Sequence, residues 1–470
     1  SEKKADLESP LKYEKGDETK EVKQKTQQGP PEKKKLSGVK KDLIGACKRY
    51  IEYVPEGERI VDVKYTMARV YYEHNHLRKA IDLFENLAFQ HSNHRLAKVA
   101  ANLHLDSLNL LNDFQGLHKA VERYLSEKPI DSSEFQSNVQ RLNRAIRFKL
   151  CRKKEQKEAW GKAATCYVNI YRDFPDSKYV DEALYNAALS FERIKELGKA
   201  IQIRAFLLKV RPDSEFAPET LFNIGANYHA LAVYSRAAQY YERFADKYPD
   251  HEKTEKALAN AATFRQGLGQ YEKAIADNEQ YLELFGDEEE HAKKVADVAF
   301  QIARIYEKQD KPEEAKEAYE TYLEEYADKG TLDRKLQAHV EIGLYHWNHG
   351  EREQALEKFR ETLAVYNDLS KKQRSKLDEG RDAAARAKFM LGEKIYQEMA
   401  EIEVESSDEK ELQKRFKKKL KVAKKAQKIY EEVIQFKRPD WAIAALYKIG
   451  AQYQDFAETI RNSPPPERLT

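Results

Sequence analysis

An all-α protein made of repeated helix pairs is the fold class that this sequence predicts. Of its 470 residues only 18 are glycine and 14 are proline, and this scarcity favours helices. A Pro-Asp element also returns at a constant step of 37 residues, as FPDS at 174–177, RPDS at 211–214 and YPDH at 248–251. An alanine and an asparagine keep the same step, at Ala163, Ala200, Ala237 and Ala274 and at Asn186, Asn223 and Asn260. Self-similarity at a fixed period predicts a repeat array.

Residues 1–36 precede the array and differ from it in composition. They are nearly free of aliphatic side chains, rich in lysine and glutamate, and contain Gly29-Pro30-Pro31. Such a segment buries too little apolar surface to offset the entropy lost on ordering. We expect a disordered charged tether, with a linker role favoured over a specific docking peptide.

Each later unit shows two amphipathic helices joined by a tight bend. In the unit around Ala237, apolar residues recur at helical spacing over 221–228, the bend falls at 231–234, and Pro249 ends the second helix. Asp and Ser after such a proline can accept hydrogen bonds from the free N–H groups that open the next helix. Neither helix can bury its apolar face alone, so successive pairs are expected to stack.

These units resemble the tetratricopeptide repeat family. The family places a small residue in the first helix, an aromatic three residues later, an alanine early in the second helix, an aromatic near its middle and a proline after it. The residues that match this pattern in one unit are Gly225, Tyr228, Ala237, Tyr241 and Pro249. The second-helix alanine recurs along the chain as Ala80, Ala120, Ala163, Ala200, Ala237, Ala274, Ala315, Ala355 and Ala426. The resemblance implies a right-handed superhelical solenoid, with a regular array over residues 37–381.

The connectors between units suggest a subtype of this family. They are longer than usual and carry the aromatic-Pro-Asp-Ser pattern of 174–177. In this respect the chain is similar to repeat proteins of bacterial envelopes, such as the TolA-associated periplasmic protein and the repeat lipoprotein of the outer-membrane assembly machine. Residues 439–466 are also similar to repeat proteins of the myxobacterial gliding machinery. The resemblance implies a periplasmic or envelope location, and a cytoplasmic one stays open as the alternative.

The alanine step slips between Ala355 and Ala426, where 71 residues separate the two positions. Apolar stripes predict a first helix from near Asp382 and a second from near Ser406, whose Ser-x-x-Glu spacing to Glu409 is typical of a capping box. Both helices extend past a normal unit by about three turns. The pair over 382–437 is therefore expected to project roughly 15 Å as a helical hairpin.

The second helix of this long pair carries nine basic residues and no acid over 414–428. The candidate docking residues are Lys414, Arg415, Lys417, Lys418, Lys419, Lys421, Lys424 and Lys425. One interpretation is a solvated face opposite the apolar stripe, and the other is a docking surface for an acidic protein or anionic lipid headgroups. Nucleic acid is disfavoured because no aromatic interleaves the lysines and the net charge of the chain is only +3.

First helices line the concave face in the resembled family, and this implies a groove that binds peptides or partner helices. The residues carried over to that groove are Tyr185, Asn186, Leu189, Phe222, Asn223, His229, Asn260, Thr263, Phe300 and Arg304. The asparagines have a second interpretation, as hydrogen-bonding residues between neighbouring helices. Ala259 and Thr263 stand where a clamp for a terminal carboxylate would need charge or amide groups, which argues against a cytosolic receptor for chaperone tails.

Motifs for catalysis or for a cofactor are not found. The sequence has no Gly-rich phosphate loop, no Gly-x-Ser-x-Gly, no His-Glu-x-x-His and no Cys-x-x-Cys. We therefore expect no enzyme, no cofactor and no metal. No apolar run approaches the roughly 20 residues that span a bilayer, so no integral membrane span is expected.

Several histidines and cysteines are candidates for metal ligands or for a cross-link. His74 and His76 are expected at a bend and His91 and His94 in a connector, about 20 Å away along one helix, so a common metal site is disfavoured. Cys151 and Cys166 show no metal spacing. We expect the first to be buried between helices, and a disulfide between the two is left open.

Residues 438–470 supply one more first helix and a proline-rich tail at Pro464-Pro465-Pro466. Without a second helix, such an end exposes apolar surface, so either the array is longer or this face is a contact. Two functions remain. One is a non-enzymatic adaptor of a multiprotein envelope machine for assembly, motility or secretion, and the alternative is a cytoplasmic assembly chaperone or regulator that binds peptide segments.

Overall fold

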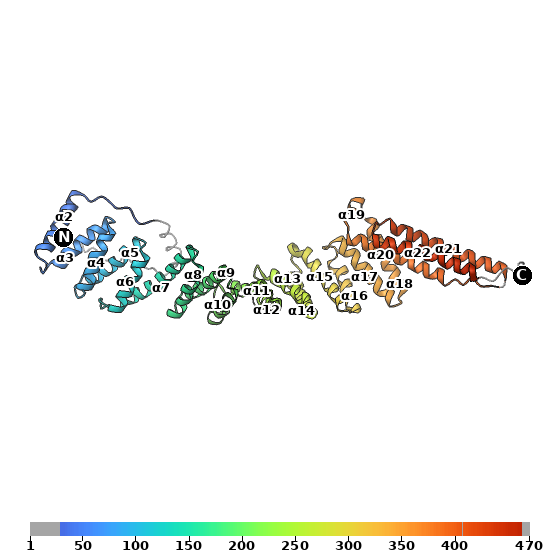
Figure 1. Ribbon diagram of the computed structural model, residues 1–470, viewed down its shortest axis with the longest axis horizontal. Helices are drawn as coiled ribbons and strands as arrows, with labels where there is room; N and C mark the ends of the chain where they lie inside the picture. The colour runs from blue at the N-terminus through green and yellow to red at the C-terminus, as the bar shows by residue number, and fades with distance from the viewer. Residues whose placement is uncertain (1–28, 407, 463–470) are drawn as a thin grey trace. The chain divides into compact units, whose positions relative to one another are not determined.

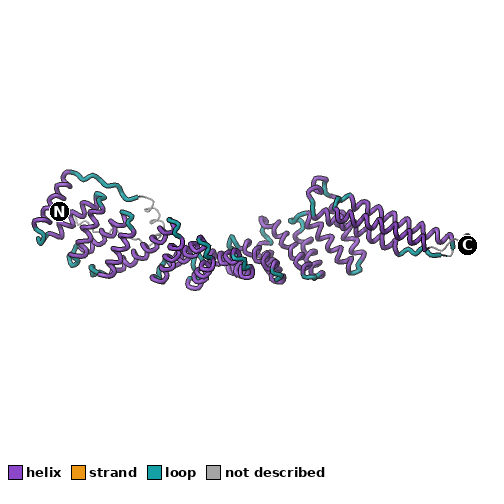
Figure 2. The backbone as a smooth tube through the Cα atoms, viewed as in Figure 1, coloured by secondary structure: helices purple, strands orange, loops and turns teal. Residues whose placement is uncertain are grey.

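The computed structural model describes residues 29–406 and 408–462, and every regular element in these residues is helical (Figure 1; Figure 2). The predicted all-α class is therefore confirmed. The described residues divide into two compact units, the first ending at Asn227 and the second beginning at Tyr228, and each is described separately. None of the helices in the described residues is long and apolar enough to cross a membrane.

The first unit is built from consecutive helix pairs, and neighbouring pairs pack against each other. Most of its helices have 14 residues, and α7 is longer, with 24. Its helices are α2 (Gly38–Tyr53), α3 (Ile60–Glu73), α4 (Leu77–Gln90), α5 (Ala97–Leu110), α6 (Phe114–Glu127), α7 (Ser133–Gln156), α8 (Trp160–Asp173), α9 (Val180–Arg193) and α10 (Leu197–Val210), followed by α11 (Ala217–Ala230), which crosses the unit boundary.

The second unit continues the same pairing and then changes to longer helices. Its elements are α12 (Tyr234–Lys247), α13 (Thr254–Gly267), α14 (Tyr271–Phe285), η1 (Glu289–His291), α15 (Ala292–Lys308), α16 (Pro312–Thr321), η2 (Tyr322–Tyr326), α17 (Leu332–Asn348), α18 (Arg352–Asp368), α19 (Lys371–Lys376), α20 (Glu379–Ala400), α21 (Glu409–Ile434) and α22 (Pro439–Asn462). The turn η2 is a π-helix directly after α16.

The second-helix alanines mark where the two helices of each pair approach each other closely. All nine are buried, because only a methyl group fits where the two helices of a pair approach each other. Four residues later most pairs bury an aromatic ring. Its hydroxyl can then donate to a glutamate of the first helix, as Tyr167 does to Glu155 at 2.6 Å and Tyr319 to Glu307 at 2.9 Å. The alanine ladder predicted this register correctly.

The Pro-Asp-Ser connectors are helix boundaries, as predicted. Phe174 follows the last residue of α8, and the side chain of Ser177 accepts a hydrogen bond from the N–H of Tyr179 at 3.3 Å. Ser214 accepts in the same way from Phe216, also at 3.3 Å. Both serines are buried, so the connectors are part of the packed structure.

Only the end of the expected N-terminal tether lies in the described residues. Residues 1–28 lie outside them, and residues 29–37 form an extended segment against the bend between α3 and α4. The N–H of Lys34 donates to the carbonyl of His74 at 2.9 Å, and Asn75 donates to the carbonyl of Glu32 at 2.7 Å. The array thus begins with a docked segment before α2.

The long helix pair expected over 382–437 corresponds to α20 and α21, but it is not a free hairpin. The third helix, α22, packs along α21 and against α20, and we call these three helices the terminal bundle. The expected capping box at Ser406 is wrong. Helix α21 begins at Glu409, and the side chain of Asp408 caps it by accepting from the N–H of Lys410 at 2.9 Å. Asp408 rather than Ser406 is the N-cap residue because it lies directly before the first helical turn.

A disulfide joins Cys151 of α7 to Cys166 of α8. Cys151 is fully buried, as expected, and its sulfur lies between the two helices of one pair. The third cysteine, Cys47, is a buried free thiol, and burial raises its pKa. The bond that the sequence left open is therefore formed in the structure.

Candidate functional site: protein-interaction surfaces

The exposed face of α21 is a row of seven lysines, which we call the lysine face. Its members are Lys414, Lys417, Lys418, Lys421, Lys424, Lys425 and Lys428, and all are exposed. Steps of three and four residues place them on one side of the helix. Lys414 lies 3.6 Å from the carboxylate of Glu411. Within the described residues the other six have no carboxylate at ion-pairing distance, so most of this charge faces solvent.

Two basic residues of the predicted docking helix do not belong to the lysine face. Lys419 is buried and forms an ion pair with Asp455 of α22 at 2.7 Å, because position 419 shares the packed face with Phe416 and Ala423. The guanidinium of Arg415 is partly buried and lies 3.3 Å from Glu411. Lys419 is therefore a packing residue, which corrects the prediction.

The first-helix candidates of the first unit lie on α9 and α11. Tyr185 is partly exposed and stacks on Phe216, with ring centroids 4.8 Å apart. Asn186 and Leu189 are partly exposed as well. Asn223 is partly exposed, whereas Phe222 is only 6% exposed and offers little surface to a partner.

The candidates near α13 in the second unit differ in exposure. His229 and Thr263 are exposed, and the His229 ring packs on Phe264 with a centroid distance of 4.7 Å. The Thr263 hydroxyl donates to a backbone carbonyl of its own helix at 2.7 Å. Asn260 hydrogen-bonds the buried Tyr241. For Asn260 the interpretation as a helix-to-helix contact is thus the better one.

The two candidates of α15 have opposite roles. Phe300 has no exposed surface, and its ring packs against Tyr319 and Tyr322, with both centroid distances 5.3 Å. It is a core residue and is removed from the proposed surface. Arg304 is exposed and forms an ion pair with Glu307 at 2.8 Å.

Sequence reasoning missed a buried charged cluster in the first unit. Arg204 of α10 is fully buried, lies 2.8 Å from Glu192 of α9, and also donates to Asn227. Asn227 in turn donates to Glu192 at 2.5 Å. A signal was present, because Arg204 lies four residues after Ala200, where most other pairs have an aromatic ring.

A second buried cluster lies between α12, α13 and α14. Arg265 is almost fully buried and donates to Glu242 at 2.8 Å. Asp277 lies nearby, and burial, together with the charge of Glu242, raises its pKa to about 8, which Arg265 only partly offsets. Asp277 is therefore largely protonated at neutral pH.

Metal ligands do not gather where the histidines cluster in sequence. His74 and His76 flank the bend between α3 and α4, and His91 follows the far end of α4. Elsewhere in the described residues, Glu288 and Glu290 lie with His291 in a geometry that could hold an ion. Both glutamates are exposed, and exposed acidic groups are common without a metal.

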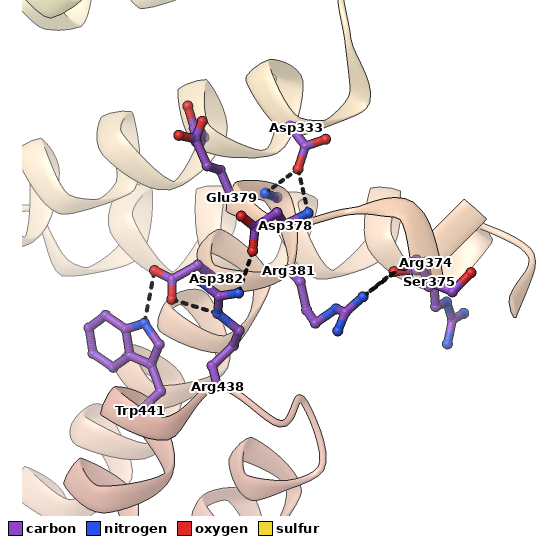
Figure 3. A network of polar contacts seen from close by, with 11 residues as sticks. Asp333, Arg374, Ser375, Asp378, Glu379, Arg381, Asp382, Arg438 and Trp441 are labelled. Atoms are coloured by element: carbon purple, nitrogen blue, oxygen red, sulfur yellow. Dashed lines mark hydrogen bonds and ion pairs between the residues drawn. The ribbon is translucent and has the colours of Figure 1, made fainter. Parts of the chain in front are cut away.

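A polar network holds α22 onto α20 at the base of the terminal bundle (Figure 3). Arg438, just before α22, lies 2.6 Å from Asp378 and 3.1 Å from Asp382. The indole N–H of Trp441 donates to Asp382 at 3.1 Å. Figure 3 also shows Asp333 of α17 accepting from the backbone where α20 begins. The start of α22 is thus fixed relative to α17 and α20.

The helix pairs and their alanine register have the pattern of tetratricopeptide repeats. Residues 219–251 and 297–329 match the tetratricopeptide repeat family model. Repeats of this kind generally bind other proteins, and proteins built from them are typically non-enzymatic. No curated protein matches the chain.

Several solved structures are similar to parts of the chain. MamA from Desulfovibrio magneticus is 15% identical over 40% of this chain and 97% of its own, with a TM-score of 0.25. A tetratricopeptide repeat protein from Parabacteroides merdae is 14% identical over 62% of this chain and 98% of its own, with a TM-score of 0.26. At these identities and TM-scores, nothing about function is carried over to this chain.

Proposed function

We propose that the chain is a non-enzymatic adaptor of a multiprotein machine in a bacterial envelope, of the assembly, motility or secretion type. In this proposal it binds protein partners through the exposed first-helix residues of its repeats and through the lysine face of α21. The lysine face supports this best, because six ammonium groups on one side of a helix without nearby carboxylates attract an acidic partner.

The proposed location, outside the cytoplasm, is supported by the Cys151–Cys166 disulfide. Structural disulfides persist in oxidising compartments such as the periplasm and are rare in the cytosol, where thiols are kept reduced. The connectors, which resemble those of envelope repeat proteins, agree with this. The alternative is a cytoplasmic chaperone. It would be favoured if Cys151 and Cys166 were reduced in cells.

The location is tested by counting thiols in cells. Cells that express the protein are acid-quenched, unfolded and alkylated before any reduction. We expect one alkylated cysteine, Cys47, and three after reduction. Three alkylated cysteines before reduction would contradict the envelope proposal.

The lysine face is tested by charge reversal. Lys418, Lys421 and Lys425 are replaced by glutamate, and the variant is used as bait in envelope extracts beside the unchanged protein. The matched control reverses three exposed lysines of α19, namely Lys371, Lys372 and Lys376. We expect the first variant, but not the control, to lose at least one partner that the unchanged protein releases at high salt. Recovery of the same partners by both variants would exclude the lysine face as a docking surface.

A further inference from the structure

Helix α22 presents large apolar side chains to solvent along one side. The exposed fractions are 67% for Ile443, 56% for Leu446, 73% for Tyr447, 63% for Tyr453 and 62% for Ile460. With Gly450 these residues recur at helical spacing, and we call them the apolar stripe. Contiguous exposed apolar surface of this kind marks an interaction site.

The position of Leu446 is covered in other repeats of this chain. The segment ALYKIGAQY in α22 aligns with ALYNAALSF in α9 and with ALANAATFR in α13, so Leu446 corresponds to Leu184 and Leu258. Leu184 is 1% exposed and packs with Leu207 of α10, and Leu258 is fully buried against Tyr281 of α14. The Leu446 position of the stripe is therefore one that accepts a second helix in other repeats, and no helix of the described residues covers it in α22.

The opposite side of α22 is firmly packed. Lys419 pairs with Asp455 as described above, Phe416 meets Phe456 edge-on with centroids 5.7 Å apart, and Lys448 lies 2.7 Å from Glu393. Contacts from both α20 and α21 therefore hold the helix along its length. The apolar stripe is therefore held as a preorganised surface.

The central part of the stripe is complementary to itself when two copies run antiparallel, and Leu446 then faces the exposed Gln454. Around Gly450, Tyr447 and Tyr453 lie three residues to either side, and Ile443 and Ala457 lie seven. A two-fold axis at Gly450 therefore places Tyr447 of one copy beside Tyr453 of the other, and Ile443 beside Ala457. A side chain at Gly450 would meet nothing within 4 Å in its own chain, so this position leaves room for close approach of a second helix.

Charges at the two ends of α22 agree with this arrangement. Asp440 and Arg461 are both exposed and lie ten residues before and eleven residues after Gly450, on the same edge of the stripe. The two-fold axis places Asp440 of each copy level with Ile460 of the other and within one residue of Arg461, so the opposite charges of Asp440 and Arg461 can form two ion pairs. We propose that α22 is a dimerisation helix that pairs antiparallel with α22 of a second copy of this chain.

The lysine face does not take part in this pairing. On α21 the residues that contact α22, Phe416 and Lys419, lie on the side opposite Lys421 and Lys425. A second copy on α22 therefore leaves the lysine face open to a partner. A single helix-to-helix seam is smaller than the roughly 800 Å² per partner of a standard interface, so we expect a dimer that dissociates on dilution.

Sedimentation velocity over a range of protein concentrations tests the proposal. We expect a monomer–dimer equilibrium in the unchanged protein. Leu446→Glu combined with Tyr453→Glu should raise the dissociation constant by roughly 100-fold or more, because each dimer would bury four charges. Gly450→Phe should also separate the copies without unfolding the helix, since its side chain has open space in the monomer. The control Tyr53→Glu changes a tyrosine on α2 that is 75% exposed and should leave the dimer intact.

Cross-linking distinguishes this pairing from other dimers. In a Cys47→Ala background, Gly450→Cys should form a disulfide-linked dimer on mild oxidation, and Tyr53→Cys should not. Circular dichroism checks that every variant keeps its helices. A protein that stays monomeric at all concentrations, or a dimer that survives both Gly450→Phe and the double glutamate variant, would overturn the proposal. Binding of a different protein to the stripe of a monomeric chain would overturn it as well.

Discussion

Arg204 shows how much one side chain can decide inside a repeat. Its guanidinium is fully buried and reaches Glu192 and Asn227 on two neighbouring helices. Hydrogen bonds from one of its nitrogens to these acceptors offset part of the cost of removing the charge from water. The same pair would be expendable on the surface, where ion pairs contribute about 0–1 kcal/mol.

Replacing Arg204 should therefore destabilise the first unit. We expect Arg204→Ala to lower the free energy of unfolding by about 2–5 kcal/mol, because it removes a fully buried side chain, leaves a cavity and takes the partner from the half-buried Glu192. Urea denaturation measures this loss. The control is Arg69→Ala, which breaks an exposed ion pair with Glu73 and should cost less than about 1 kcal/mol. Equal losses in the two variants would contradict the role of Arg204.

Asp277 should make the second unit sensitive to pH. Its pKa is about 8 in the folded chain and about 3.9 when unfolded. Between these values the folded chain binds one more proton here than the unfolded chain, so stability falls as pH rises toward 8 and levels off above it. The groups that face Asp277 are Glu242 and Asp246, which raise its pKa, and Arg265 and Lys273, which lower it.

Comparing unfolding free energies across this pH window tests the prediction. The unchanged protein should lose stability relative to Asp277→Asn as the pH rises from about 5 to about 9, since asparagine cannot titrate. A difference between the two proteins that is constant over this range would show that Asp277 is ionised throughout.

For individual residues, the sequence predicted the burial of small and aromatic side chains well, but it did not predict the buried charged side chains. Alanines and tyrosines repeat, so their burial follows from register. Arg204 and Asp277 depart from the repeat, and what surrounds them depends on side chains from the next helices. Phe300 was wrong as a binding candidate because one residue along a helix rotates the side chain by about 100°, which is enough to exchange an exposed position for a core position.

Among the elements, the α7–α8 pair is the one with a covalent link. The disulfide closes a loop with a sequence separation of 15 residues, and closing such a loop stabilises by about 3 kcal/mol in the chain-entropy model. We expect reductant to lower the melting temperature of the unchanged protein but not of Cys166→Ala. If both proteins respond alike, the effect of reductant comes from elsewhere in the chain.

The start of α21 offers a direct comparison of two cap assignments. Asp408→Ala should destabilise the terminal bundle by about 1 kcal/mol, because the first turn of α21 would lose its side-chain acceptor. Ser406→Ala should cost less, since its hydroxyl accepts from the N–H of Asp408, which precedes the helix, and not from the first turn of α21 among the described residues. Hydrogen exchange of residues 409–412 measures fraying. If Ser406→Ala frays more than Asp408→Ala, the cap is formed by Ser406, as the sequence predicted.

Helix lengths were predictable where the spacing of the second-helix alanines is regular. They were less predictable between Ala355 and Ala426, where that spacing is lost. The alanine ladder located every pair up to α18, and the long stripes of α20 and α21 indicated their extra turns. The packing of α22 along both of them was missed, because the apolar pattern of a helix does not say which neighbour it meets. The cap at Asp408 was missed because Ser406 offered a similar local pattern.

For the whole molecule, a repeat array predicts unfolding in parts. Each pair contacts mainly its neighbours, so stability is close to a sum of local terms. We expect Arg204→Ala to speed hydrogen exchange mainly in α8 to α11 and Asp277→Asn to change it mainly in α12 to α15. Exchange that changes uniformly over both units in either variant would indicate one cooperative domain instead.

The Arg204 cluster also limits how such a chain can evolve. Unequal recombination can delete or duplicate one 37-residue unit without shifting the register of the rest. The repeat that contains Glu192 and Arg204, however, needs Asn227 from the repeat that follows it. Reordering the repeats would leave the buried guanidinium of Arg204 without one of its acceptors. The repeats are therefore not interchangeable, and selection for stability should preserve their order.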